Sequence, residues 1–127
     1  MKFKKAKEIF DAYNTKWTDH HIYAHGTRVM DYCTEVYKEM NPDKVYMIDL
    51  SLAAKYHDIG KILFSPKLIS GGYTFTEKDI RLFKKHVKRS YEILKAFYGD
   101  GLIAEIALHH HERMDGSGYF KGLKGEE

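Results

Sequence analysis

The sequence has little of what would place a protein outside the cell or in a membrane. Cys33 is its one cysteine, which excludes an internal disulfide and fits a reducing compartment. No apolar run approaches the roughly 18 residues that a membrane span needs, and no signal-peptide pattern opens the chain. We therefore expect a cytoplasmic protein without a membrane partner.

Internal repeats, low-complexity tracts and convincing strand-like alternation of apolar and polar residues are also lacking. Apolar residues instead recur at spacings of three and four, which predicts amphipathic helices. A length of 127 residues, 43% of them hydrophobic and 14% aromatic, indicates one packed domain. We predict an all-α fold in which about five helices form a compact bundle over residues 1–127.

Neither sign of charge dominates the chain, because the formal net charge is only +3. The lysines near residues 2–7 and the cations of residues 84–89 fall on segments that read as amphipathic helices. Solvated helix faces explain this pattern better than a nucleic-acid-binding patch does. We therefore expect no DNA partner.

Turn and capping signals divide the chain into helical segments. Asn41 is expected to cap a helix whose first turn holds Pro42, and Thr76 is expected to form a capping box with Asp79. Residues 60–75 are expected to form a loop. The helices are expected over about residues 2–14, 18–40, 42–58, 76–98 and 102–111.

The third predicted helix is apolar nearly all round over residues 45–54, so we expect it to be central and buried on most sides. At its end come His57 and Asp58. Adjacent residues on a helix point about 100° apart, but the following Gly60 lets the chain leave the helix. His57 and Asp58 can therefore converge on one ion.

Histidine is abundant, with eight residues in the chain. Taken singly, His25 and His86 read as hydrogen-bonded core histidines, and residues 109–111 read as a polar helix end. Taken together, burial of several imidazoles without a shared purpose is costly, because each ring nitrogen needs a partner. A shared metal centre of one or two ions satisfies them at once. The ligand-type residues on the four inward stripes are His25, His57, Asp58, His86, His110 and His111.

The ligand types favour a transition metal. Imidazoles with a carboxylate suit iron, manganese, nickel or zinc, whereas a lone magnesium ion prefers oxygen ligands. Cys33 lacks the neighbours of a structural zinc site and reads as a core residue. Two ions bridged by a carboxylate can hold a hydroxide as nucleophile and neutralise an attacked phosphate.

The order of these residues resembles the HD superfamily of metal-dependent phosphohydrolases. The finer resemblance is to its HD-GYP subfamily of cyclic di-GMP phosphodiesterases. It covers the chain from about His21 onward and leaves the first helix outside. The motifs that carry it are residues 57–61 (HDIGK), Pro66, residues 76–77, residues 110–119 (HHERMDGSGY) and residues 122–126 (GLKGE).

The resemblance implies a phosphodiester hydrolase with two divalent ions, iron or manganese before nickel or zinc, acting on a nucleotide or cyclic dinucleotide. It also implies a signalling partner domain. Asp58 would bridge the ions as a catalytic residue, and Lys61 would contact the substrate phosphate and stabilise developing charge. Arg113 is a second candidate phosphate contact. Implied metal ligands are His25, His57, Asp58, His86, His110 and His111.

Other residues of the motif receive supporting roles. Glu112 and Asp115 read as orienting groups, and Tyr119 is expected to shape the loop of the site. His21 stands where relatives with a third metal have glutamate. Since His21 lies four residues before His25, it shares a helix face with that ligand.

Two further departures keep the function open. Phe120 replaces the motif's final proline, which removes a backbone restriction on Tyr119. The family continues into another helix bearing an aspartate ligand, so we expect either part of a longer product or a naturally short version. The alternatives to an enzyme are a degenerate domain that binds metal or nucleotide as a regulatory module, and a plain helical domain with structural histidines.

Overall fold

The computed structural model describes residues 1–40, 45–72 and 74–126. Within them the chain forms α-helices and one 3-10 helix, and its only β pairing is an isolated bridge between Asp115 and Lys124. The all-α prediction is confirmed. The elements are α1 (Phe3–Thr15), α2 (His21–Met40), α3 (Met47–Tyr56), η1 (Ile59–Leu63), α4 (Pro66–Ile69), α5 (Glu77–Lys84), α6 (His86–Tyr98) and α7 (Leu102–His109).

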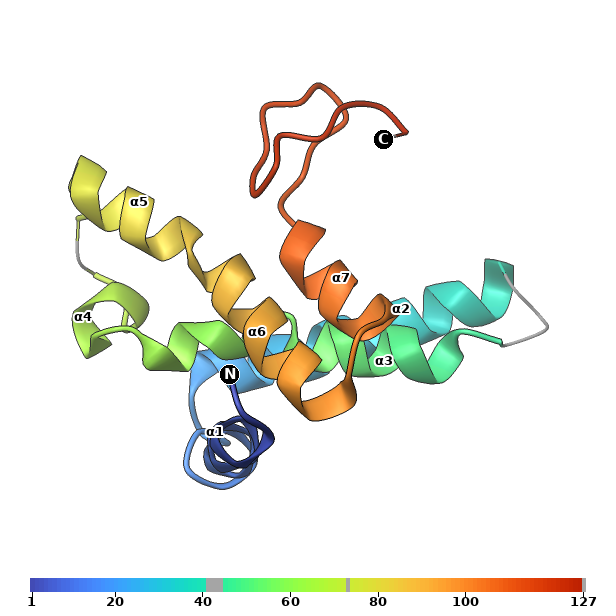
Figure 1. Ribbon diagram of the computed structural model, residues 1–127, viewed down its shortest axis with the longest axis horizontal. Coiled ribbons are helices and arrows are strands. Elements are labelled where there is room, and N and C mark those ends of the chain that lie inside the picture. The colour runs from blue at the N-terminus through green and yellow to red at the C-terminus, as the bar shows by residue number, and fades with distance from the viewer. Residues whose placement is uncertain (41–44, 73, 127) are drawn as a thin grey trace.

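The helices are arranged so that several of their ends meet (Figure 1). α2 and α3 run side by side, α7 packs against α3 and α6, and α6 packs against η1. α1 packs against α6 and η1 on the side opposite α7. The end of α3, the start of α6 and the end of α7 therefore come together in the middle of the molecule.

The core lies between α1, α6 and the end of α3. Phe10 stacks on Phe97 with ring centroids 4.2 Å apart and contacts the ring of Tyr56 at 4.3 Å. The fully buried Tyr13 donates a hydrogen bond to the carbonyl oxygen of Lys55 at 3.1 Å. These contacts anchor the segment that leads into His57.

The segment predicted as a loop over residues 60–75 contains η1 and α4, so that prediction was wrong for half its length. Pro66 occupies the first turn of α4, where its fixed φ and missing N–H are favourable. The prediction that residues 41–42 cap and start a helix lies outside the described residues.

The capping box at residue 76 is confirmed. Thr76 Oγ1 accepts from the backbone N–H of Asp79 at 3.1 Å, and the Asp79 carboxylate accepts from the N–H of Thr76 at 3.0 Å. The single helix predicted over residues 76–98 is instead broken at Lys85 into α5 and α6. At the break the Phe83 carbonyl accepts a hydrogen bond from Nδ1 of His86 at 2.8 Å. A side chain that bonds a backbone carbonyl in this way interrupts the regular backbone hydrogen bonds of a helix.

The other helix ends shift by a few residues. α2 begins at His21 rather than at residue 18 or 19, because His20 Nδ1 accepts the Ile22 N–H at 3.1 Å and takes the capping role. The hydroxyl of Thr18 instead contacts the Thr15 carbonyl. α7 ends at His109, two residues early.

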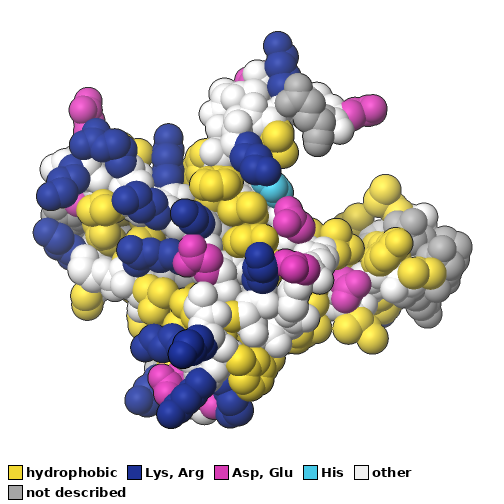
Figure 2. Space-filling model, in the orientation of Figure 1, with side chains coloured by type: hydrophobic (Ala, Val, Ile, Leu, Met, Phe, Trp, Pro, Cys, Tyr) yellow, Lys and Arg dark blue, Asp and Glu magenta, His cyan; other side chains and the backbone are white. Residues whose placement is uncertain are grey.

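The prediction that α3 is buried on most sides was wrong for its first half. Ala53, Ala54 and Tyr56 are buried, but Ile48 is 74% exposed. At the end of α2, Met40 is likewise 72% exposed. The reason is that this end of the α2–α3 pair projects beyond α6 and α7, and Figure 2 shows its apolar side chains uncovered on the right. No helix in the described part of the chain is long and apolar enough to span a membrane.

Candidate metal centre

Four helices bring ligand-type side chains to one place. His25 lies one turn into α2, His57 caps α3 and Asp58 follows it outside the helix with φ −106° and ψ 12°. His86 is the first residue of α6, and His110 caps α7 with His111 after it. Because most of these positions are helix ends, the chain can turn each side chain inward without interrupting a helix.

Asp58 is the centre of the cluster. Its Oδ1 lies 3.2 Å from Nε2 of His86 and 3.4 Å from Nε2 of His110. Its Oδ2 lies 3.2 Å from Nε2 of His57 and 3.7 Å from Nε2 of His25. The two oxygens thus face two different sets of imidazoles. Ligand atoms within 4.8 Å of one another define one set as Asp58, His86, His110 and His111 and the other as His25, His57 and Asp58.

Backbone carbonyls hold three of the imidazoles in one tautomer. Nδ1 of His57, His86 and His110 lies 2.6–2.8 Å from the carbonyl oxygen three residues earlier in each case. A carbonyl only accepts, so each Nδ1 carries the proton and donates it. In the neutral ring, Nε2 then presents a lone pair toward Asp58, the usual arrangement of a metal-binding histidine.

The charge states of the cluster also favour cation binding. Burial would raise the pKa of Asp58, but the imidazoles of His110, His57 and His86 hold it well below its usual range. Burial together with the neighbouring His110 and His86 lowers the pKa of His111 to about 4. Asp58 is therefore ionised and His111 neutral at pH 7, and these are the forms that bind metal.

His57 and His25 respond to Asp58 differently. Burial lowers the pKa of His57, but its hydrogen bond to Asp58 and the charge of that carboxylate outweigh burial and raise it. Burial and the neighbouring His57 lower the pKa of His25, whose side chain is 46% exposed. His25 is thus the solvent-facing member of the cluster.

The residues present fit a divalent cation. Asp58 Oδ1 is buried, and no hydrogen-bond donor in the described part of the chain satisfies it. When the rings are neutral with the proton on Nδ1, their Nε2 lone pairs face the same carboxylate at 3.2–3.4 Å, so acceptors oppose acceptors unless a proton or a cation lies between them. A buried acceptor without a donor costs about 1–3 kcal/mol, and a cation between these atoms would remove that cost. Imidazole and carboxylate donors suit a transition metal.

A cavity of about 350 Å³ opens beside the cluster. Lys61 lies on its wall, with Nζ 3.2 Å from Asp58 Oδ2 and 5.0 Å from the centre of the Phe83 ring. The cavity is lined by His21, Ile22, His25, Asp58, Lys61, Leu68, Ile69, Gly71, Phe75 and Phe83.

The structure places the remaining predicted residues at different distances from the centre. Tyr119 stacks on His111, with ring centroids 4.8 Å apart and an interplanar angle of 14°. His21 lines the cavity next to His25 but belongs to neither ligand set. Arg113 and Asp115 are exposed in the loop after α7 and line neither this cavity nor the one beside Tyr119.

Glu112 organises that loop. Its carboxylate accepts from the backbone N–H groups of residues 121, 122 and 123 at 2.8–3.0 Å. The N–H of Tyr119 donates to the His111 carbonyl at 3.2 Å. Gly118 packs so closely that a Cβ would overlap the same carbonyl. The loop is therefore tied to the end of α7, which positions Tyr119 against His111.

Some contributors to the site were not identified from the sequence. Ser90 Oγ accepts from the N–H of Gly60 at 2.8 Å and joins η1 to α6. Its position four residues after His86 places both on one helix face, a signal that could have revealed it. Leu68 and Ile69 line the cavity from α4, which lay in the segment predicted as a loop.

Comparison with known proteins agrees with this geometry. A family model described as "HD domain" matches residues 16–127. A cyclic di-GMP phosphodiesterase of Thermotoga maritima is 33% identical over 124 residues, covering 94% of this chain and 34% of the relative. A 3'3'-cGAMP-specific phosphodiesterase of Vibrio cholerae is 30% identical over 103 residues, covering 81% of this chain and 24% of the relative.

A third relative, a cyclic di-GMP phosphodiesterase response regulator of Xanthomonas campestris, is 40% identical over 81 residues, covering 61% of this chain and 21% of the relative. The chain thus spans about a third or less of the length of these curated relatives. The family model by itself matches residues 16–127, which is most of the chain. This chain therefore belongs to the HD domain family, in which it resembles the HD-GYP phosphohydrolases.

Proposed function

We propose that the chain is a metal-dependent phosphodiesterase that hydrolyses a cyclic dinucleotide. The observation that carries the proposal is the buried carboxylate of Asp58, whose oxygens face two sets of imidazoles beside an open cavity. The three relatives described above are named as phosphodiesterases of cyclic di-GMP or 3'3'-cGAMP. Such a substrate supports the cytoplasm as the place of action, and a signalling partner domain stays a prediction.

The proposed ligands are the six residues of the two sets, with Asp58 shared between two ions. Iron or manganese is proposed before nickel or zinc. When bound, divalent ions supply activation of water and neutralisation of the attacked phosphate. Within the chain, the carbonyl-bound Nδ1 atoms keep the imidazoles oriented, so the site needs little rearrangement to bind a cation.

Lys61 is the proposed contact to the scissile phosphate. Its side chain is mostly buried at 19% exposure, and its ammonium group lies near both Asp58 and the ring of Phe83 in the cavity wall. A cation in such a partly desolvated place stabilises charge that develops on a phosphate more strongly than one in water does. Arg113 stays a second candidate phosphate contact, with Asp115 and His21 as accessory candidates.

Turnover of cyclic di-GMP by the manganese- or iron-loaded protein tests the proposal. Asp58→Asn keeps the side-chain volume but removes the charge, so we expect at least about a 1000-fold loss of the rate constant. Asp100→Asn is the matched control, because Asp100 is an exposed acid paired with Lys95 on the surface. Stoichiometric metal without turnover in the unaltered protein would contradict the enzyme.

A further inference from the structure

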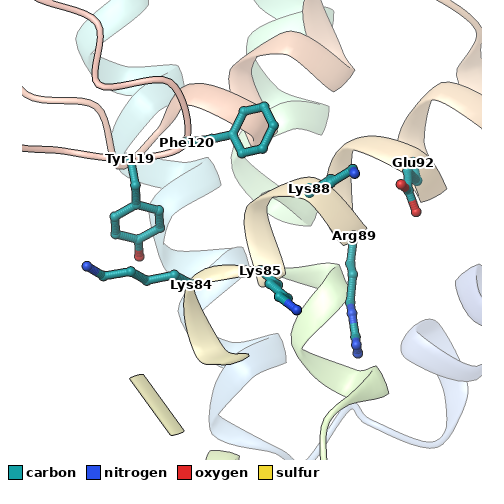
Figure 3. Close-up of a pocket in the computed structure, with 7 residues that line it drawn as sticks. All are labelled: Lys84, Lys85, Lys88, Arg89, Glu92, Tyr119 and Phe120. Atoms are coloured by element: carbon teal, nitrogen blue, oxygen red, sulfur yellow. The ribbon is translucent and has the colours of Figure 1, made fainter. Parts of the chain in front are cut away.

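A second cavity lies on the other side of Tyr119 from the metal centre. Its volume is about 480 Å³, and Figure 3 shows side chains of α5 and α6 below the loop that carries the two aromatic residues. The site described above uses only one member of its wall, Tyr119. The lining residues are Lys84, Lys85, Lys88, Arg89, Glu92, Tyr119 and Phe120.

Positive charge is concentrated at this cavity. Lys85 at the start of α6 and Arg89 are a like-charged pair four residues apart, which destabilises a helix by a few tenths of a kcal/mol, and Lys84 at the end of α5 and Lys88 line the same cavity. None of these four cations forms an ion pair with an acidic residue in the described ranges 1–40, 45–72 and 74–126. Figure 2 shows Lys and Arg side chains gathered on this side of the molecule. An anionic ligand would relieve the repulsion.

Aromatic surface adjoins the cations. Lys84 Nζ lies 5.3 Å from the centre of the Tyr119 ring, and Phe120 is 45% exposed on the loop above. Cations that bind phosphate next to exposed rings that stack on bases are the usual components of nucleotide recognition. The cavity therefore offers contacts for both parts of a nucleotide.

Tyr119 joins the cavity to the metal centre. One face of its ring stacks on His111 at 4.8 Å, and Lys84 lies over the ring at 5.3 Å. His111 belongs to the ligand set around Asp58 Oδ1. Tyr119 thus lines the cationic cavity and also contacts a residue of the proposed metal centre.

We infer that this cavity binds the second phosphate of the substrate and the nucleoside next to it, while the scissile phosphate lies at Asp58. The inference rests on the proposed function and names its substrate class as one with two phosphates. Lys84 and Lys88 contact the second phosphate, and Phe120 provides a stacking surface for the base. The cavity beside His25, at about 350 Å³, is at the small end for a ligand site and holds the other half.

The test measures binding without metal, so that it does not depend on turnover. Cyclic di-GMP is titrated into the EDTA-treated protein by calorimetry. We expect Lys84→Gln/Lys88→Gln to weaken binding about tenfold or more. The control pair Lys78→Gln/Arg81→Gln removes the same charge from α5 outside the cavity, and we expect less than a twofold change. Cyclic GMP, which has one phosphate, should show a smaller loss in the cavity variant.

The outcomes separate the inference from the proposed function. If the metal-loaded protein turns over cyclic di-GMP but the two variant pairs have equal affinity and equal KM, the cavity inference fails alone. If the cavity pair is selectively weakened but no turnover occurs, the proposed function fails alone. Absence of binding to the metal-free protein, or tighter binding of a single-stranded oligonucleotide through the same lysines, also overturns the inference.

Discussion

Asp58 combines burial with full charge, which few carboxylates in a protein of this size do. Its residue is 4% exposed, yet the imidazoles around it hold its pKa well below the usual range. Its neighbour His57 ends α3, and Asp58 itself has left the helix, so adjacent residues converge where helical geometry would separate them. The sequence predicted this convergence, but not for the right reason: the chain leaves α3 at His57 and Asp58, and Gly60 lies inside η1 without a positive φ.

The histidine triplet of residues 109–111 allows a matched pair of variants. His110 Nε2 points at Asp58, whereas His109 Nε2 lies 3.4 Å from Glu105 on the outer face of α7. We expect His110→Ala to lower metal affinity at least about 100-fold and His109→Ala to change it by less than about threefold. Metal content after dialysis against a graded chelator measures both. Equal effects would show that the triplet acts only as a polar helix end.

Tyr13 gives a pH dependence in the core, to which the nearby charge of Asp58 also contributes. Burial raises the pKa of Tyr13, while the unfolded value stays near 10. Above pH 10 the unfolded chain binds fewer protons than the native chain, so this residue's contribution to stability falls as pH rises, by about 1.4 kcal/mol per unit.

Tyr13→Phe removes both that titration and the hydrogen bond to Lys55. We expect the variant to be about 1 kcal/mol less stable at pH 7 and the difference to vanish or reverse near pH 11. Urea unfolding at pH 7, 10 and 11 measures the difference in stability between the two proteins. The other tyrosines are present in both proteins, so their titration cancels in the comparison. A difference that is constant with pH would show that Tyr13 does not stay protonated in the native state.

At the scale of elements, the contact between η1 and α6 decides how far Asp58 lies from His86. Gly60 has no room for a side chain, because a Cβ would lie 2.6 Å from the His86 carbonyl oxygen and 2.7 Å from the Ser90 nitrogen. The requirement is for close approach between backbones. Asp58 precedes this contact by two residues, and His86 forms part of it.

Gly60→Ala should push η1 away from α6. We expect a loss of about 2–3 kcal/mol in the free energy of unfolding and a lower metal affinity in the variant that remains folded. Gly99→Ala is the control for metal affinity: its φ is +88°, its ψ is −179° and nothing lies within 4 Å, so backbone strain of about 1–3 kcal/mol lowers stability while metal affinity should stay unchanged. Denaturant unfolding with metal titration tests both, and unchanged metal affinity in Gly60→Ala would contradict the coupling.

For the whole molecule, four helices contribute proposed ligands, so cation binding should stabilise the entire fold. A cation at 100 times its Kd adds about 2.7 kcal/mol if it binds only the native state, which corresponds to a rise of several degrees in Tm. We expect EDTA to lower Tm by this amount, manganese to restore it, and magnesium to restore less.

Asp58→Asn should make Tm insensitive to both EDTA and manganese. Differential scanning calorimetry over a series of metal concentrations provides the measurement. A Tm that does not respond to manganese, iron, nickel or zinc in the unaltered protein would contradict the shared metal centre at the level of the fold.

The sequence by itself indicated most of the helices, the capping box at Thr76 and the proposed ligand types that meet at Asp58. These features depend on the spacing of apolar residues and on hydrogen bonds between residues close along the chain. Such local patterns can be read from a single sequence. Only the tertiary structure decided which end of α3 is buried, where the helix over residues 76–98 breaks, and that Tyr119 separates a cationic cavity from His111. Burial and cavity walls depend on contacts between distant segments, and these follow from how helix ends pack rather than from any local pattern.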